Sequence, residues 1–416
     1  MESYVIHGGN RLSGKVKVDS AKNSVLPIIA ATILTNEEVA IKNCPKILDV
    51  INMVKILESL GARCEFFCDD LIIDAKNIDS FTIPCTLTKE LRSSIFLLGA
   101  LLSRLKRAEI SYPGGCDIGK RPIDIHVDAL KSLGVEINED EDKIFCRYRK
   151  NHGGKIRLKF PSVGATENVI LASVFSKGKT EIHNCAKEPE IVDLMCFLNS
   201  MGAKIYGAGT STILIEGVEK LHGTTFRPIP DRIEAGTFLI AAAITGGEVE
   251  LCNCKIKNIF ALVHKLCNNT CKIRIKDDII YLQSGRSRKS FSLTTSPYPG
   301  FPTDLQPQMT ALAAVSEGES RITENLFDMR FGFADELVKM GADIKLKDNV
   351  AFIKGVKTLK GADVTARDLR GGAALVLAGL QAEGQTTLCG IRHVERGYFN
   401  FDGKLRSLGA QIIRRG

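Results

Sequence analysis

The stretch Val54-Lys55-Ile56-Leu57-Glu58-Ser59-Leu60-Gly61-Ala62 ends in a pattern that recurs along the chain and decides the fold. Its apolar residues follow a helical period, and Gly61 stands where such a helix would end in a left-handed residue. The same ending returns every 68 to 73 residues, as Leu133-Gly134-Val135, Met201-Gly202-Ala203, Asn269-Thr270-Cys271, Met340-Gly341-Ala342 and Leu408-Gly409-Ala410. This spacing predicts six copies of one structural unit, of which the fourth, at Thr270, is degenerate.

Two further markers precede each of these helix endings. The first is a run of small apolar residues that we expect to be helical, at 25–34, 95–102, 169–175, 238–244, 310–315 and 373–380. The second is a short alternating strand after that run, at 39–41, 109–111, 180–182, 249–251, 320–322 and 386–388. Each unit is therefore expected to contain strand, helix, strand, helix, strand and strand in that order. Because helices rich in Ala, Gly and Leu can pack closely, we place them inside and the sheets outside.

The number of units bears on the domain organisation. Six units of about 70 residues are too many for one hydrophobic core, whereas three units fit an ordinary domain. The break between the third and fourth units is expected near 228–230. The first strand, 14–18, resembles the strands at 223–226 and 361–364 that open later units. The sequence therefore predicts an α/β protein of two domains with three βαβαββ units in each.

Composition narrows the class of protein. The 416 residues are 44% hydrophobic and 25% charged, as in soluble globular proteins. The longest apolar run, 95–102, is too short to cross a membrane, and the N-terminus lacks the pattern of a signal peptide. The thirteen cysteines are scattered along the chain without paired C-x-x-C spacing, and there are only seven histidines. We expect free thiols in a reducing compartment and no structural zinc.

The charge pattern favours small anionic partners. The net charge of +8 is mild for this length. The densest basic run, Arg286-Ser287-Arg288-Lys289, contains no aromatic residue for stacking on bases, and we interpret it as a solvated hairpin tip. Phosphorylated small molecules are therefore favoured over nucleic acid.

The stretch Pro113-Gly114-Gly115-Cys116-Asp117-Ile118-Gly119-Lys120-Arg121-Pro122 indicates a glycine-rich loop around a thiol. Nearby Lys120 and Arg121 would lower the pKa of Cys116 and make it a better acid or nucleophile. One alternative is a small buried cysteine. Another is a phosphate-binding loop, because Gly114 to Lys120 spells G-x-x-x-x-G-K; however, Arg121 stands where that motif needs Ser or Thr to hold magnesium.

The expected inner helices begin with polar residues in every unit. These starts are Ser20-Ala21-Lys22-Asn23, Leu91-Arg92-Ser93-Ser94, Ser162-Val163-Gly164, Asp231-Arg232-Ile233-Glu234, Pro302-Thr303-Asp304 and Arg367-Asp368-Leu369-Arg370. A cation at a helix start is disfavoured by the helix dipole and indicates a bound anion. For Ser162, Asp304 and Asp368 the alternative is plain N-capping.

Three loops add further charge, namely 188–190, 327–330 and 393–398. For each loop taken alone, the alternative is a solvated surface charge. Together with the basic residues at the helix starts, they predict a surplus of cations on equivalent edges of the repeats. Two domains that meet at these edges would enclose a positive cleft.

Five motifs in combination resemble the UDP-N-acetylglucosamine enolpyruvyl transferase family, also called 1-carboxyvinyltransferases, over essentially the whole chain. They are Ser-Ala-Lys-Asn (20–23), the cysteine loop (113–122), Glu-Pro-Glu-Ile-Val-Asp (188–193), Pro-Thr-Asp (302–304) and Asp-Leu-Arg (368–370). The resemblance implies an inside-out α/β barrel of two pseudo-threefold domains. One would comprise 20–229 and carry the Cys116 loop, the other 1–19 and 230–416, with the active site in the cleft between them.

The resemblance also implies a reaction. The enolpyruvyl group of phosphoenolpyruvate would move to the 3′-hydroxyl of UDP-N-acetylglucosamine through a tetrahedral ketal, with release of phosphate. This is the first committed step of peptidoglycan synthesis, which implies a cytoplasmic enzyme of cell-wall biogenesis that affects cell shape, cell cycle and cell division and is a target of fosfomycin. No cofactor, metal, nucleic acid or membrane partner is expected, and the sequence does not predict the oligomeric state.

Site residues are carried over motif by motif. Cys116 would be the general acid, which also forms a covalent adduct with phosphoenolpyruvate, and Asp304 would be the base; Lys22, Asp368 and Arg396 complete the expected catalytic set. The expected substrate-binding residues are Lys22, Asn23, Arg92, Lys120, Arg121, Pro122, Ile123, Asp124, Ile125, Ser162, Val163, Gly164, Glu188, Asp304, Leu326, Phe327, Arg330, Arg370 and Arg396.

Some features depart from the family or leave alternatives. Asp117 stands where the family commonly has Thr, and its carboxylate would raise the pKa of the neighbouring thiol. The stretch 399–403 is less charged than the family's helix. The nearest alternative is 3-phosphoshikimate 1-carboxyvinyltransferase, against which the cysteine loop and Glu188-Pro189-Glu190 argue. A non-catalytic nucleotide-sugar-binding repeat protein would need neither Cys116 nor Asp304.

Overall fold

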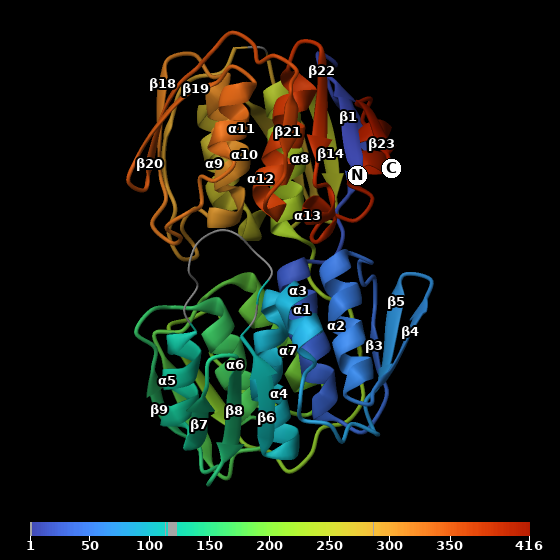
Figure 1. The fold of residues 1–416 in the computed structure, drawn as a ribbon, viewed down its shortest axis with the longest axis vertical. Helices are drawn as coiled ribbons and strands as arrows, with labels where there is room; N and C mark the ends of the chain where they lie inside the picture. Colours follow the sequence, from blue (N-terminus) through green and yellow to red (C-terminus); the bar gives the residue numbers. More distant parts are fainter. Residues whose placement is uncertain (1, 113, 115–122, 286) are drawn as a thin grey trace. The chain divides into compact units, whose positions relative to one another are not determined.

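The computed structural model describes residues 2–112, 114, 123–285 and 287–416 (Figure 1). Cys116, Lys120, Arg121 and Pro122 therefore lie outside the described residues. The chain forms two compact units. We call the described part of 20–229 the N-terminal unit and residues 2–19 together with 230–416 the C-terminal unit, and describe each by itself.

Three sheets form the outside of the N-terminal unit (Figure 1). In order across each sheet, their strands are β13 (Thr225–Phe226), β3 (Val39–Ile41), β5 (Asp70–Asp74) and β4 (Arg63–Phe67); β6 (Arg107–Ser111), β8 (Lys143–Tyr148) and β7 (Val135–Glu139); and β11 (Lys204–Tyr206), β12 (Thr212–Glu216), β10 (Lys179–His183) and β9 (Gly154–Arg157). In the second sheet, a parallel bridge between Thr82 and Glu109 stands at the place of the fourth strand.

The inner helices of this unit are α1 (Lys22–Ala31) with η1 (Thr32–Leu34), α4 (Phe96–Leu105) with η2 (Arg92–Ile95), and α6 (Val163–Ser173). Around them lie α2 (Leu48–Ser59), α3 (Cys85–Glu90), α5 (Asp124–Ser132) and α7 (Pro189–Ser200). Nearly every residue of α1 and α6 is buried. At Gly99 a Cβ would collide with the backbone of Asn168, so the small residue is what allows α4 to approach α6.

The C-terminal unit repeats this plan. Its sheets contain β2 (Ser13–Lys17), β14 (Glu248–Cys252), β16 (Ile279–Gln283) and β15 (Lys272–Lys276); β17 (Ser292–Thr294), β18 (Glu319–Thr323), β20 (Val350–Lys354) and β19 (Asp343–Lys347); and β21 (Asp363–Thr365), β22 (Gln385–Cys389), β1 (Ser3–His7) and β23 (Gln411–Arg415). The inner helices are α8 (Arg232–Thr245), α10 (Gln306–Ala314) with η4 (Thr303–Leu305), and α12 (Leu369–Gln381). The outer helices are α9 (Phe260–Asn268) with η3 (Ile256–Asn258), α11 (Ala334–Lys339), α13 (Arg392–Glu395) and α14 (Phe401–Ser407).

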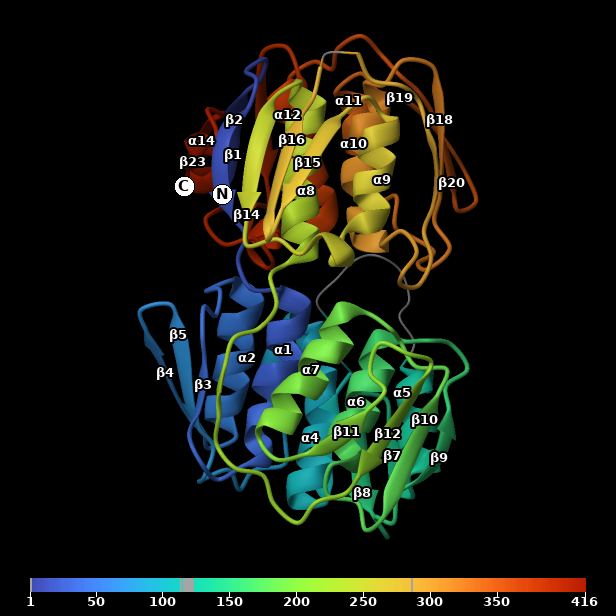
Figure 2. The same cartoon turned by 180° about the vertical axis from the view of Figure 1, so that it is seen from behind.

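Strands distant in sequence complete the repeats at the two places where the chain passes from one unit to the other. Strand β2 pairs in parallel with β14, and β13 pairs in parallel with β3. The N-terminal strand β1 lies antiparallel between β22 and β23 (Figure 1). Figure 2 shows the blue N-terminal strands beside the yellow strand β14 of the same unit. Among the described residues, only 154–216 and 292–354 are contiguous βαβαββ units, because the other copies borrow a strand from elsewhere or lack a regular one.

The helix endings confirm the repeat that the sequence predicts. Gly61, Gly134, Gly202, Gly341 and Gly409 all have positive φ, between 81° and 108°. Thr270 holds the equivalent place with φ 73°, although a β-branched residue strongly disfavours that conformation. The degenerate copy therefore keeps the backbone geometry without the residue that suits it.

Other expectations meet mixed outcomes. All six predicted inner helices and short strands are present, with the helices inside and the sheets outside. The twelve described cysteines are free thiols. Within the described ranges, no helix combines the length and apolar character needed to cross a bilayer. The interpretation of 286–289 as a solvated tip is wrong for Arg288, which is buried and donates to the carbonyl oxygens of Ala243 and Ile244 at the end of α8.

Candidate active site

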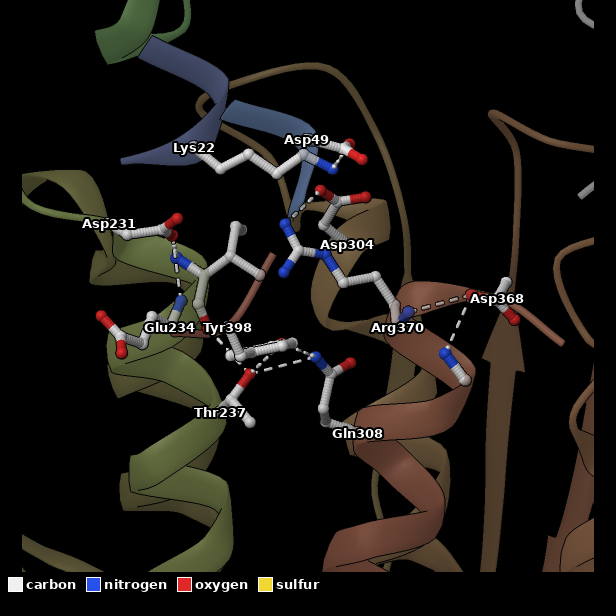
Figure 3. Close-up of polar contacts among 12 residues, drawn as sticks. Lys22, Asp49, Asp231, Glu234, Thr237, Asp304, Gln308, Asp368, Arg370 and Tyr398 are labelled. Atoms are coloured by element: carbon white, nitrogen blue, oxygen red, sulfur yellow. Dashed lines mark hydrogen bonds and ion pairs between the residues drawn. The ribbon is translucent and has the colours of Figure 1, made fainter. Parts of the chain in front are cut away.

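In the C-terminal unit, Asp304 is held by two buried arginines. Its Oδ1 lies 2.8 Å from Nη2 of Arg330, and its Oδ2 lies 3.1 Å from Nη2 of Arg370. The arginine side chains are 3% exposed, whereas that of Asp304 is 26% exposed. Three elements bring these groups together, because Asp304 lies in η4, Arg330 in the loop after β18, and Arg370 in the first turn of α12. Figure 3 shows the contact between Asp304 and Arg370.

This geometry corrects two interpretations. Asp304 is not the N-cap residue of η4, because Pro302 takes that position. Arg330 is not a solvated loop charge. A carboxylate with both oxygens bonded to guanidinium groups is fixed in orientation, and its partial exposure leaves it accessible. The arrangement presents an oriented carboxylate to a ligand at a defined position.

Asp368 confirms the capping alternative. Its Oδ1 accepts from the backbone N–H groups of Arg370 and Gly371, each at 2.9 Å, at the start of α12. The acid offsets the dipole that would otherwise oppose Arg370 in the first turn. At Gly371 a Cβ would collide with the Asp368 carboxylate, which explains the glycine after Arg370.

The remaining predicted residues of this unit lie in two loops. The N–H of Leu326 donates to Glu324 at 2.8 Å, and the Phe327 ring centroid lies 5.7 Å from the guanidinium carbon of Arg330. Arg396, half-buried, follows α13 directly. In the same segment Tyr398 is buried, so 393–398 is not a solvated loop throughout.

In the N-terminal unit, Lys22 pairs with an acid that the sequence did not single out. Lys22 Nζ lies 2.8 Å from Oδ2 of Asp49, whose side chain is 1% exposed. Asp49 occupies the first turn of α2, where an acid would normally be attributed to the helix dipole, so its pairing could not be read from the pattern. The predicted cation surplus is therefore partly neutralised at Lys22, Arg330 and Arg370. Asn23 follows Lys22 in α1, and half-buried Arg92 opens η2.

Two predicted substrate-binding stretches come together across α5 and α6. Ser162 caps α6 by accepting from the N–H of Ala165 at 3.3 Å, which confirms its capping alternative. Val163 and Gly164 form the first turn of α6, while Ile123 precedes α5 and Asp124 and Ile125 begin it. A Cβ on Gly164 would lie 3.0 Å from the imidazole of His126.

His126 joins this cluster although the sequence did not flag it. Its Nδ1 lies 2.9 Å from Nδ2 of Asn168, which also donates to the carbonyl of Ile95. Desolvation, with a contribution from the charge of Arg92, lowers the pKa of His126 to about 4, so the ring is neutral near pH 7. It cannot serve as a cation for an anionic ligand.

A set of acidic residues lies at the start of α7 and on the neighbouring helix α6. Glu188 is the N-cap residue of α7, Pro189 its first residue, and Glu190 is buried, so this is not a solvated loop. Glu167 on α6 is 1% exposed, and neither carboxylate oxygen has a hydrogen-bond partner in the part of the chain that the structure describes. Burial, with the nearby charges of Glu190 and Glu188, raises its pKa well above the ordinary value. Within the described residues, no cluster of three His, Cys, Asp or Glu could hold a metal ion.

Comparison with known proteins first gives the class. The enolpyruvyl transferase NikO from Streptomyces tendae has a solved structure that matches 99% of this chain and 98% of its own, with a TM-score of 0.87 and 27% identity. The fold is thus that of the enolpyruvyl transferases, as the sequence motifs implied. The EPSP synthase (3-phosphoshikimate 1-carboxyvinyltransferase) family matches residues 6–405.

Sequence relatives then narrow the family. UDP-N-acetylglucosamine 1-carboxyvinyltransferase 2 of Caldanaerobacter subterraneus subsp. tengcongensis is 51% identical over 415 residues, covering 100% of both chains. UDP-N-acetylglucosamine 1-carboxyvinyltransferase 1 of Symbiobacterium thermophilum is 49% identical, covering 99% of this chain and 95% of its own. The chain therefore belongs to the EPSP synthase family and, within it, to the UDP-N-acetylglucosamine 1-carboxyvinyltransferases.

Proposed function

We propose that the chain transfers the enolpyruvyl group of phosphoenolpyruvate to the 3′-hydroxyl of UDP-N-acetylglucosamine and releases phosphate. The observation that carries the proposal is the carboxylate of Asp304, fixed by Arg330 and Arg370 and still partly exposed. Relatives across the full chain length are named for this activity. A role in peptidoglycan synthesis, and through it in cell shape and division in the cytoplasm, follows from the reaction.

The proposed chemistry is addition followed by elimination. Asp304 accepts the proton of the sugar 3′-hydroxyl while the sugar oxygen attacks C2 of phosphoenolpyruvate. Cys116 delivers a proton to the methylene carbon. The resulting tetrahedral ketal carries both the sugar oxygen and the phosphate. Loss of a methyl proton and of phosphate restores the double bond, so that the products are enolpyruvyl-UDP-N-acetylglucosamine and inorganic phosphate.

Residues of both units take part in this proposal. Lys22, Arg121 and Arg396 bind the phosphate or carboxylate of phosphoenolpyruvate, with Arg92 and Arg370 in support. Asn23, the 121–125 stretch, Ser162 to Gly164 and Leu326 hold the sugar nucleotide. Guanidinium and ammonium groups supply the charge stabilisation that the ketal needs, so we assign no step to a metal or cofactor.

The test is phosphate release from purified protein supplied with phosphoenolpyruvate and one acceptor at a time. We expect release with UDP-N-acetylglucosamine and none with shikimate 3-phosphate. The family match described for EPSP synthase makes shikimate 3-phosphate the second candidate acceptor. Turnover with that acceptor alone would reverse the assignment, and binding of the sugar nucleotide without any phosphate release would favour a non-catalytic binder.

The thiol has its own test. Cys116→Ser should abolish or severely impair turnover while binding of UDP-N-acetylglucosamine survives. Saturating fosfomycin, an epoxide analogue of phosphoenolpyruvate, should add covalently to Cys116 in the wild type, as measured by mass spectrometry of the peptide. Wild-type turnover in the Ser variant, or an unmodified thiol under saturating drug, would remove Cys116 from its assigned role.

A further inference from the structure

A buried polar junction lies directly beneath Arg370 in the C-terminal unit. It consists of Tyr398, Thr237 on α8 and Gln308 on α10, of which Tyr398 is 2% exposed and the other two are 0% exposed. The Tyr398 and Thr237 hydroxyl oxygens are 2.8 Å apart. Nε2 of Gln308 donates to Thr237 at 3.1 Å and to Tyr398 at 3.2 Å (Figure 3). Two inner helices thus converge on one phenol.

The protons of this junction have one consistent arrangement. The Thr237 hydroxyl donates to the carbonyl of Ile233 at 2.8 Å, so its oxygen is left to accept from the Tyr398 hydroxyl. The Tyr398 oxygen then accepts from Gln308. Each donor therefore has an acceptor, and the phenol is held in a single orientation.

The Tyr398 ring is also fixed on its sides. Its neighbour is the Phe401 ring, with the centroids 4.7 Å apart, and Phe401 packs in turn against Phe238 at 5.7 Å. The guanidinium carbon of Arg370 lies 5.4 Å from the centroid of the Tyr398 ring. The ring is thus a rigid surface on which the guanidinium rests.

Arg370 needs such a surface because few acceptors other than the Asp304 carboxylate and the Tyr398 oxygen reach it. Its Nη2 bonds Asp304, whereas Nε and Nη1 are buried without a hydrogen-bond partner among the described residues. A long side chain held only at its tip has several rotamers available, and an aromatic face attracts a guanidinium that lacks oxygen partners.

We propose that Tyr398, locked by Thr237 and Gln308, is a positioning residue that holds the guanidinium of Arg370 against Asp304. The inference rests on the proposed function, which gives Asp304 and Arg370 their roles. It assigns Tyr398 no contact with substrate. Loss of the ring frees Arg370, and an error of about 1 Å in the orientation of a proton acceptor is enough to slow a reaction about a hundredfold.

A purely structural role of Tyr398 predicts a different result. If Tyr398 only fills the core, its replacement lowers stability, and any loss in rate multiplies with losses at Arg370. If it acts through Arg370, the losses do not multiply, because a displaced arginine cannot be displaced again. A double-mutant cycle separates the two forecasts.

The experiment measures phosphate release from phosphoenolpyruvate and UDP-N-acetylglucosamine by the wild type, Tyr398→Leu, Arg370→Lys and the double variant. We expect Tyr398→Leu to lower kcat by about tenfold or more. We expect KM for the sugar nucleotide to stay within about threefold, and the double variant to be within about twofold of Arg370→Lys. Losses that multiply across the cycle would overturn the proposal.

Two further variants control for folding. Tyr398→Phe keeps the ring and should recover most of the rate lost in Tyr398→Leu; if Phe is as slow as Leu, the ring is not the active part. Phe197→Leu, at a buried aromatic in the N-terminal unit, should lower the melting temperature without changing kcat. Should Tyr398→Leu fail to fold, Tyr398→Met takes its place in the cycle.

Failure of the two proposals is distinguishable. A folded wild type that releases no phosphate from this substrate pair contradicts the proposed function and this inference with it. An active wild type whose cycle multiplies contradicts the positioning role alone.

Discussion

The two units share one architecture but bury different ionisable groups in their inner helices. In the C-terminal unit, α12 presents Arg370, which is bonded to Asp304 and supported by a phenol. In the N-terminal unit, α6 presents Glu167, whose two oxygens have no hydrogen-bond partner within the described ranges. The backbone repeat therefore does not determine which ionisable groups the inner helices bury. Arg370 is the second residue of α12 and Glu167 is the fifth residue of α6, so the two groups stand at different positions of the repeat.

Both units also tie their inner helices together with neutral groups. In the N-terminal unit, Asn168 on α6 accepts from the N–H of Gly99 at 2.8 Å and donates to the carbonyl of Ile95 at 2.9 Å. In the C-terminal unit, the Tyr398 junction serves α8 and α10. Buried polar groups that are paired in this way favour one packing of the helices, because another packing leaves more of them unpaired. The exception in the junction is Oε1 of Gln308, which has no hydrogen-bond partner among the described residues.

The largest effect is expected when the negative charge of Asp304 in the C-terminal unit is removed. Asp304→Asn should lower kcat by about 10²- to 10⁴-fold, because the amide keeps the shape of the carboxylate but is a poor proton acceptor. Affinity for UDP-N-acetylglucosamine, measured by calorimetry, should change only a few-fold. A loss of affinity as large as the loss of kcat would show that Asp304 binds the sugar rather than acting as a base.

A second prediction concerns how each unit closes an inner helix. Arg288 donates to the carbonyls of Ala243 and Ile244 at 3.0 and 2.6 Å, and in the N-terminal unit Arg104 donates to those of Ile33, Thr35 and Ala75 at 2.7 to 3.0 Å. Arg288→Met should lower the free energy of unfolding by about 3 kcal/mol, since charge-assisted bonds to buried carbonyls are lost. Urea unfolding measures the change. Lys289→Met, at the exposed neighbour, should be near neutral, and equal effects at both positions would deny the capping role.

The third prediction tests the unpartnered acid of the N-terminal unit. The pKa of Glu167 is raised in the folded protein. The contribution of this carboxyl to the stability of the protein is therefore fully present below the ordinary carboxyl pKa, and it is lost as the pH rises through the raised pKa. Glu167→Gln should therefore be near neutral at pH 5 and stabilising at pH 8.

Thermal unfolding at several pH values measures this difference. Glu141→Gln, at an exposed position of the same unit, should give a curve parallel to that of the wild type. A Glu167→Gln curve that is also parallel would mean that the carboxyl is ionised in the folded protein.

How far the sequence anticipated these features depends on the range of the interactions. The helix endings and short strands were predictable, because Gly61 and its counterparts act within a few residues. Capping by Ser162 and Asp368 was also local. The pairing of Lys22 with Asp49, and of Asp304 with two arginines, joins segments that only the fold brings together. Arg288 was misjudged for the same reason, since its acceptors lie more than 40 residues earlier.

The smallest expected effect lies at Thr270, the position where one of the six repeated helix endings has no glycine. Thr270 has φ 73°, which costs a β-branched residue about 1–2 kcal/mol, and its hydroxyl offsets part of this by donating to the carbonyl of Ser287 at 2.6 Å. Thr270→Gly should therefore raise the free energy of unfolding by about 0.5–1 kcal/mol, because the exposed Ser287 carbonyl can bond water instead. The reverse change, Gly341→Thr, isolates the backbone contribution, since a Cβ there would meet no atom within 4 Å. It should cost about 1–2 kcal/mol in urea unfolding. A neutral Gly341→Thr would show that the repeat tolerates any residue at its helix endings, and that the five glycines need another explanation.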